Sequence, residues 1–289
     1  MLNKVCAVIV SYNDFENLKD TLNAVEMQVD KIVIVDNGSE DEIVNFINQL
    51  CLFNEKIILI SLKENLGIAV ALNKGVHLAE KEGYDYVLTL DQDSKCSEGL
   101  VLKLLSGFDL DRKIAIVSPK IAYEKMKNNL IIQEKFEFKD YIITSGNLIK
   151  IDVFNKIGYF EEKLFIDSVD FDFCLRIINK GFLICIRNDA FLFHKLGNPR
   201  EIKVFGLLKY YYTEHSSVRN YYIFRNTVFL LKKYFKSNTL FCFKKMIITS
   251  KLFFENIFFH YQKKEVIKYM FMGLKDGFNG KYGGYSNDK

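Results

Sequence analysis

The sequence predicts an α/β protein with a mostly parallel, Rossmann-like sheet flanked by helices, followed by a helical C-terminal segment. Over the first 120 residues, short apolar runs rich in β-branched residues alternate with amphipathic stretches, as in βαβ units. Polar residues follow each of the first four runs. From about residue 200 the chain becomes rich in Lys, Arg, Tyr and Phe, which indicates a segment of different character.

The alternation places the elements of the first half. Four strands are expected, at Val5–Val10, Lys31–Val35, Lys56–Leu62 and Tyr86–Leu90. Helices are expected between and after them, at about 15–27, 40–50, 68–82 and 98–107, and a fifth strand at Ile114–Ser118. Ser39 is expected to cap the second helix, because Glu42 stands three positions further on and completes a capping box.

The pattern changes beyond residue 120. Residues 128–150 are expected to form paired strands that lead into Thr144–Asn147, and a helix at about 168–180 precedes a short strand at Phe182–Ile186. Beyond Pro199 the composition indicates a helical tail. We therefore expect two domains, an α/β domain at 1–199 and a helical, basic and aromatic segment at 200–289.

Composition narrows the class of protein. With 49% hydrophobic residues and 2 prolines the chain is globular, and its net charge of +4 gives little support to nucleic-acid binding, so no nucleic acid is expected as a partner. The six cysteines include no CxxC pair, which favours reduced thiols in the cytosol. The apolar run Val5–Val10 is too short for a signal peptide, so we expect a protein that is not exported.

The C-terminal segment is expected to lie on a membrane surface. Its uncharged stretches fall short of the roughly 18 to 20 residues that a spanning helix needs. Basic and aromatic residues are mixed in it, as in Lys232–Lys236 and Phe241–Lys245. This mixture is typical of helices that bind at the membrane interface.

Candidate ligand-binding residues stand directly after the predicted strands, and the carboxyl ends of parallel strands share one edge of a sheet. Asp91 and Asp93 could present two carboxylates to a hard cation that also binds a diphosphate, although an isolated Asp-x-Asp is more often a solvated loop. Asp36 could accept a hydrogen bond from a pyrimidine base, or could only stabilise the turn that it begins. Asn65 and Gly67 could approach a ligand, or form only a loop-to-helix junction.

Several motifs in order along the chain carry a resemblance to a known family. They are VIVSYN at 8–13, IVDNGS at 34–39, NLGIAVALNKG at 65–75, LTLDQDS at 88–94, TSGN at 144–147, GYFEE at 158–162 and FIDSVDFDFCLR at 165–176. Together they resemble glycosyltransferase family 2, whose members are inverting enzymes with a GT-A fold. The resemblance covers about residues 5–226, and within the family the motifs look most like bacterial rhamnosyltransferases of surface polysaccharide synthesis.

The resemblance implies a donor site in residues 1–199. Ser11 and Asp36 would hold the nucleobase and Asn73 would lie near the ribose. Asp91 and Asp93 would bind Mg²⁺ or Mn²⁺, with Asp93 in direct contact with the ion, and His194 matches a late histidine that often completes such a metal site. Without the family, a lone histidine is more often a satisfied core or surface residue.

The acidic segment before the predicted helix at 168–180 is expected to supply the catalytic base. Inversion needs a carboxylate that takes the proton of the attacking acceptor hydroxyl. Many relatives have Glu-Asp here; alignment on Cys174–Arg176 places Val169 at the Glu and Asp170 at the Asp. Asp170 is therefore the expected base, Asp167 is the substitute, and both would also suit a helix N-terminus. Arg225 could approach the diphosphate, or lie on a solvated helix face.

The expected reaction is inverting transfer of L-rhamnose from dTDP-β-L-rhamnose to a lipid-linked glycan, at the cytoplasmic face of the cell membrane. A UDP-hexose donor is an alternative, since base contacts by Asp36 do not separate thymine from uracil. A second alternative is a nucleotide-binding scaffold that has lost its chemistry. A dehydrogenase is excluded, because Ser11–Asp14 contains no glycine-rich phosphate loop.

Overall fold

The computed structural model describes residues 3–122, 134–193, 200–204 and 208–285. Within them the chain forms two compact units. The first comprises residues 3–162 and 169–193, and the second comprises residues 163–168 and 200–285. The two units are described separately.

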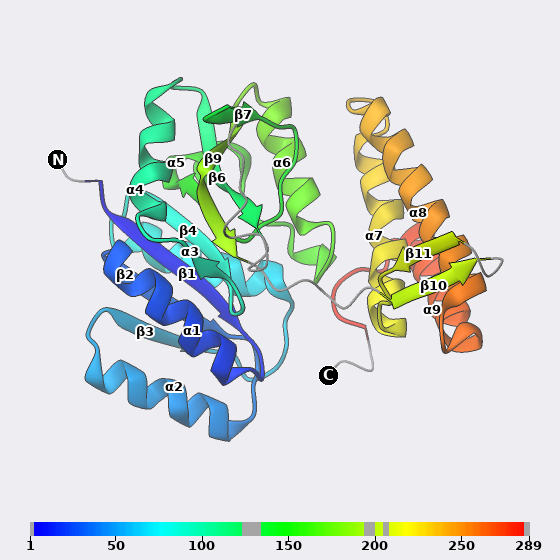
Figure 1. Ribbon diagram of the computed structural model, residues 1–289, viewed down its shortest axis with the longest axis horizontal. Helices are drawn as coiled ribbons and strands as arrows, with labels where there is room; N and C mark the ends of the chain where they lie inside the picture. The colour runs from blue at the N-terminus through cyan, green and yellow to red at the C-terminus, as the bar shows by residue number, and fades with distance from the viewer. Residues whose placement is uncertain (1–2, 123–133, 194–199, 205–207, 286–289) are drawn as a thin grey trace. The chain divides into compact units, whose positions relative to one another are not determined.

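The first unit is built on a mixed sheet. In the described residues it has nine strands, in the order β3-β2-β1-β4-β8-β6-β9-β5, with β7 paired to β9. The strands are β1 (Val5–Ser11), β2 (Lys31–Asp36), β3 (Ile57–Ser61), β4 (Tyr86–Asp91), β5 (Lys95–Cys96), β6 (Ile114–Ala122), β7 (Phe136–Phe138), β8 (Asn147–Lys150) and β9 (Leu183–Phe193). β3, β2, β1 and β4 are parallel neighbours, seen side by side in Figure 1, whereas β8 runs antiparallel to β4.

Helices cover both faces of this sheet. They are α1 (Phe15–Val25), α2 (Asp41–Phe53), α3 (Ile68–Lys81), α4 (Leu100–Leu105), α5 (Ile151–Ile157) and α6 (Val169–Asn179). Val5, Ala7 and Ile9 of β1 belong to one apolar cluster with α1 and α4. Val8 points to the other face, where a Cβ at Gly75 of α3 would lie 2.3 Å from its Cγ1. Strands covered on both faces read as continuous apolar runs, which explains why β1 shows no alternation.

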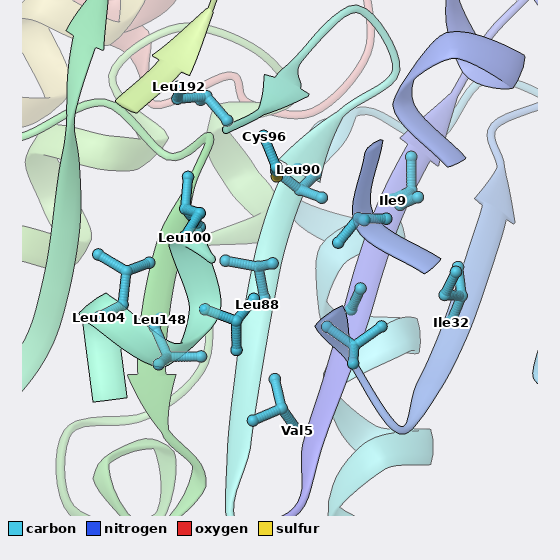
Figure 2. Packing of buried hydrophobic residues seen from close by; sticks show 14 of the residues in the cluster. Val5, Ile9, Ile32, Leu88, Leu90, Cys96, Leu100, Leu104, Leu148 and Leu192 are labelled. Atoms are coloured by element: carbon cyan, nitrogen blue, oxygen red, sulfur yellow. The ribbon is translucent and has the colours of Figure 1, made fainter. Parts of the chain in front are cut away.

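The core of the first unit is aliphatic. Figure 2 shows side chains of β1, β2, β4, β8 and α4 packed together, among them Ile9, Ile32, Leu88, Leu100 and Leu148. The six cysteines, all of which lie in described residues, form no disulfide. Burial raises the pKa of Cys96 and of Cys174 to about 12, so these thiols pack as small hydrophobic groups, as their apolar neighbours in sequence predict.

Three local predictions are wrong. Ser39 does not cap α2, because its hydroxyl donates to Asp36 instead. Glu40 is the N-cap residue, and its side chain makes no cap hydrogen bond. In the described part of 128–150, β7 and β8 do not pair with each other; β7 pairs with β9, and β8 inserts between β4 and β6. The short strand expected at Phe182–Ile186 extends to Phe193 as β9, because β6 and β7 both pair along it.

The second unit is mainly helical. Its helices are α7 (Ser217–Tyr234), α8 (Thr239–Phe259) and α9 (Lys263–Asn279). A Cβ at Gly273 of α9 would lie 2.3 Å from the carbonyl oxygen of Tyr221, so this glycine permits α7 and α9 to approach closely. The tail does not begin as a helix: an antiparallel hairpin, β10 (Arg200–Val204) and β11 (Leu208–Tyr212), precedes α7. No helix in the described residues is both long and apolar enough to cross a membrane.

Candidate active site

Candidate ligand-binding residues end three neighbouring parallel strands. Ser11 is the last residue of β1 and pairs in register with Asp36, the last residue of β2. Asp91, the last residue of β4, pairs with Val10 on the other side of β1. The polar strand ends therefore meet at one edge of the sheet, as the sequence predicts, where open α/β sheets bind their ligands.

The Asp36 carboxylate is fixed by its neighbours. The Ser11 hydroxyl donates to Asp36 Oδ1 over 3.3 Å, and the backbone N–H of Ser39 donates to Oδ2 over 3.0 Å. The Ser39 hydroxyl donates to the same carboxylate, and Asp36 is fully buried. These bonds hold the carboxylate in one orientation at the end of β2.

Asn65 and Gly67 form the junction between β3 and α3. The backbone N–H of Gly67 donates to Asn65 Oδ1 over 3.0 Å, as does Nδ2 of Asn37 in the loop after β2. Gly38 (φ +85°) brings the two loops into backbone contact, since a Cβ there would lie 2.5 Å from the carbonyl carbon of Glu64. The loops after β2 and β3 therefore form one rigid wall beside Asp36.

Gln92, the residue between Asp91 and Asp93, ties their loop to the loop after β1. Its Oε1 accepts from the backbone N–H of Tyr12 over 2.7 Å, and its Nε2 donates to the carbonyl oxygen of Tyr12 over 3.1 Å. On the other side, the backbone N–H of Asp91 donates to Ser145 Oγ over 3.0 Å. The two predicted metal ligands, one at the end of β4 and one in the loop that follows, thus stand in a segment that is anchored at each side.

Asp91 and Asp93 fit one class of metal site. Among the described residues, no group of three or more His, Cys, Asp and Glu side chains is gathered as a closed metal site. Two carboxylates suit Mg²⁺ or Mn²⁺, since Mg²⁺ is usually bound by one or two carboxylates together with substrate phosphates and water. His194, the predicted further ligand, lies outside the described residues.

Asp170 stands in the first turn of α6. Its Oδ1 accepts from the backbone N–H of Phe171 over 2.8 Å. A buried ion pair in the same helix was missed in the sequence analysis. Asp172 is fully buried and pairs with Arg176 over 2.8 Å, and Arg176 donates to the carbonyl oxygen of Tyr159 over 2.7 Å. The i,i+4 spacing of Asp172 and Arg176 is the signal that could have found this pair.

Asp167 belongs to the second unit and has an unusual backbone. Phe165, Asp167 and Ser168 have φ values of +63°, +62° and +68°. Non-glycine residues rarely adopt this conformation, and it costs of order 1 to 3 kcal/mol at each position. Asp167 pairs with Arg219, whose Nε lies 3.4 Å from Asp167 Oδ2.

Asn226, which the sequence did not single out, holds this strained segment. Its Nδ2 donates to the carbonyl oxygens of Leu164, Ile166 and Asp167 over 2.7 to 2.9 Å. Asn226 is fully buried in α7. One amide therefore offsets part of the backbone strain beside a candidate catalytic carboxylate.

Asn73 and Arg225 both make hydrogen bonds within the protein. Asn73 Nδ2 donates to the carbonyl oxygen of Phe160 over 3.0 Å and to Glu162 Oε1 over 2.9 Å, within the first unit. Arg225 is 1% exposed in the second unit and donates to the carbonyl oxygens of Lys163 and Leu164. Neither alternative considered for Arg225, a diphosphate contact or a solvated face, describes a guanidinium buried among backbone carbonyls.

Replacing Arg225 is therefore expected to cost stability more than donor affinity. Arg225→Ala removes charged hydrogen bonds and leaves buried carbonyls unpaired, which should lower the free energy of unfolding by about 3 kcal/mol or more. Arg219→Ala, on the same helix but half exposed, should lower it by about 1 kcal/mol or less. Chemical denaturation measures both variants. Equal effects of the two substitutions would contradict the structural role of Arg225.

This combination of fold and site defines a class of proteins: α/β proteins whose parallel strands end in polar residues at the carboxyl edge of the sheet, with an Asp-x-Asp pair after one of them. The model of the family "Glycosyl transferase family 2" matches residues 6–174. The chain belongs to this family, and it is a glycosyltransferase with the GT-A fold.

The similar curated proteins point the same way. The chain is 32% identical over 249 residues to the dTDP-rhamnosyl transferase RfbF of Shigella flexneri, with 81% of each chain covered. It is 29% identical over 148 residues to the poly-β-1,6-N-acetyl-D-glucosamine synthase of Staphylococcus aureus (strain COL), covering 50% of this chain and 34% of that protein. The chain thus spans about a third of the synthase, whereas its match to the rhamnosyl transferase covers most of both chains.

Solved structures show the same fold at low identity. The mannosyltransferase PcManGT from Pyrobaculum calidifontis, in complex with GDP-Man and Mn²⁺, matches 99% of this chain and 77% of its own, with a TM-score of 0.61 and 14% identity. GalNAc-T7 with UDP, GalNAc and Mn²⁺ matches 68% of this chain and 45% of its own, with a TM-score of 0.56 and 16% identity. The predicted fold class is confirmed.

Proposed function

We propose that this protein transfers L-rhamnose from dTDP-β-L-rhamnose to a hydroxyl group of a lipid-linked glycan, with inversion at the anomeric carbon. The observation that carries the proposal is the meeting, at one sheet edge, of the fixed carboxylate of Asp36 and the pair Asp91 and Asp93. The similarity to a dTDP-rhamnosyl transferase over 81% of the chain supports this choice of donor.

The nucleotide half of the donor is bound at the ends of β1 and β2. Asp36 accepts a hydrogen bond from the ring N–H of the pyrimidine base, and Ser11 orients the carboxylate through its hydroxyl. The wall made by Asn65 and Gly67 borders this position. Asp91 and Asp93 would hold Mg²⁺ or Mn²⁺, which neutralises charge on the diphosphate when bound. Mn²⁺ in the structures of two similar glycosyltransferases supports a divalent ion here.

Asp170 acts as the general base. Its carboxylate takes the proton of the acceptor hydroxyl while that oxygen bonds to the anomeric carbon from the face opposite the diphosphate. The bond from the anomeric carbon to the diphosphate oxygen breaks in the same displacement, and dTDP leaves. A single displacement inverts the anomeric centre, so β-linked donor gives an α-L-rhamnoside.

A UDP-hexose is the second candidate donor. Asp36 recognises a ring N–H that thymine and uracil share, so this contact does not separate the two bases. The similarity to a synthase of an N-acetylglucosamine polymer supports this candidate. A scaffold without chemistry is the third candidate, and donor hydrolysis separates it from both enzymes.

The test of this proposal is release of nucleoside diphosphate from a panel of nucleotide sugars by the purified chain. We expect the highest rate with dTDP-β-L-rhamnose and a requirement for Mg²⁺ or Mn²⁺. A higher rate with a UDP-hexose would replace the donor, and no release from any sugar nucleotide would support the inactive scaffold.

The proposed position at the inner face of the membrane rests on α8 and α9. A stripe of exposed apolar residues runs along α8 at helical spacing: Leu240, Phe243, Ile247, Phe254 and Phe258. Together α8 and α9 carry seven lysines against three acidic residues. An apolar stripe flanked by lysines is the pattern of helices that bind anionic lipid surfaces. A lipid-linked acceptor would be presented at the same surface.

Vesicle binding tests this position. Phe254→Ser with Phe258→Ser should weaken sedimentation with phosphatidylglycerol vesicles about tenfold or more, because two exposed aromatic rings no longer enter the interface. High salt should weaken binding of the unaltered chain as well. Phe53→Ser, which removes an exposed ring from α2, is the matched control and should bind normally. Unchanged binding by the α8 variant would exclude this stripe as the membrane contact.

A further inference from the structure

A cavity of about 810 Å³ opens on the first unit. Its walls come from the C-terminal half of β6, from the residues around β7 and from the segment that follows β7. Pro119, Lys120, Glu137 and Tyr141 are among the lining residues. The donor site proposed above uses none of the lining residues.

One segment of chain forms both a wall of this cavity and part of the candidate site. Tyr141 lines the cavity, and its ring lies 5.5 Å from the ring of Phe171, the residue after Asp170. Four residues further on, Ser145 accepts the hydrogen bond from the backbone N–H of Asp91. The segment that lines the cavity therefore also contacts the residue after the expected base and bonds to the backbone of one expected metal ligand.

The segment that forms this wall of the cavity is held by two further contacts. A Cβ at Gly146 (φ +87°) would lie 2.7 Å from Pro119 Cγ, so the turn after Ser145 lies directly on the lining residue Pro119. Ile142 accepts a hydrogen bond from the thiol of Cys174 in α6 over 3.8 Å. Both contacts hold the wall in a fixed place relative to α6 and β6.

The charges of the described lining residues balance. They include two lysines, Lys120 and Lys139, and two glutamates, Glu134 and Glu137. A phosphate or diphosphate site carries an excess of cations, and the described part of this lining carries none. The Lys139–Glu137 ion pair, Lys120, Glu134 and the amide of Asn188 supply donors and acceptors for hydroxyl groups. Tyr141, which is 44% exposed, adds an aromatic face for the C–H groups of a sugar ring.

We infer that this cavity binds the saccharide part of the acceptor, as a neutral sugar that packs on Tyr141 and presents its hydroxyl toward Asp170. The inference rests on the proposed function, because only a glycosyltransferase has an acceptor to place there. The cavity volume of about 810 Å³ is within the range of about 300 to 1,000 Å³ that is typical of pockets for small organic ligands, so a sugar fits in it.

Transfer to simple glycosides tests the inference. Probes are the octyl glycosides of glucose, galactose, N-acetylglucosamine and rhamnose, together with octyl glucuronide as an anionic sugar. The measured quantity is the ratio of donor transferred to donor hydrolysed by water. We expect transfer to a neutral glycoside and not to the glucuronide. Tyr141→Ala should lower the ratio about tenfold, through a higher KM for the glycoside.

Tyr141→Phe keeps the ring and should keep most of the transfer, and Phe53→Ala, a change at an exposed ring on α2, should leave the ratio unchanged. Preference for the glucuronide, donor hydrolysis without transfer to any neutral glycoside, or an unaltered ratio in Tyr141→Ala would overturn the inference while leaving the proposed donor in place. Absence of donor turnover by the unaltered chain would instead contradict the proposed function.

Discussion

Asp93→Ala is expected to abolish sugar transfer while leaving the fold intact. The carboxylate lies on a loop after β4, outside the aliphatic core, so its removal costs little stability. Loss of a metal ligand removes several kcal/mol of stabilisation of the developing diphosphate charge, which corresponds to about 10³-fold or more in rate. The measurement is the transfer rate with Mg²⁺ or Mn²⁺ present, together with thermal unfolding.

A matched control and chelation complete this test. Asp152→Ala removes an exposed carboxylate near the start of α5. Lys150, two positions before it, pairs with Tyr86, which is at the opposite end of β4 from Asp91. It should transfer sugar at a near-normal rate. Near-normal transfer by Asp93→Ala, or full activity of the unaltered chain in excess EDTA, would show that the metal assignment is wrong.

Asp170→Asn is expected to lower the transfer rate by about 10² to 10⁴-fold, the usual cost of losing a general base. The amide keeps the volume and can still accept from the backbone N–H of Phe171, but it cannot take the acceptor proton. Because the base acts only as the hydroxyl attacks, donor affinity measured by calorimetry should stay near normal.

Asp167→Asn separates the two carboxylates. It should be milder, because Asp167 is paired with Arg219 and held in a strained segment by Asn226, which points to a structural contribution. A dead Asp167 variant beside an Asp170 variant of normal rate would move the base by three residues, to Asp167.

The sequence predicted the parts of the fold that depend on local pattern. β1, β2 and β4 are buried on both faces, so each appears as a mainly apolar run, and the polar residues that end them mark the ligand edge of the sheet. Pairing of β1 with β2 and with β4 then brings Ser11, Asp36 and Asp91 to the same edge.

Features that depend on competing or distant partners were missed or wrong. A capping box at Ser39 was plausible locally, but the buried Asp36 carboxylate competes for the same hydroxyl. The hairpin β10–β11 lies in a segment whose aromatic and basic composition is equally typical of helices. Arg225 was expected either at the diphosphate or on a solvated helix face, and only the fold shows that its partners include carbonyl oxygens about 60 positions earlier in the chain.

The most direct test of the central claim is the NMR spectrum of the product formed from dTDP-β-L-rhamnose and an accepted glycoside. A single displacement assisted by Asp170 predicts an α-L-rhamnoside and one equivalent of dTDP. A β-L-rhamnoside would contradict the inverting mechanism, and a product that forms only from a UDP-hexose would contradict the assignment of the donor.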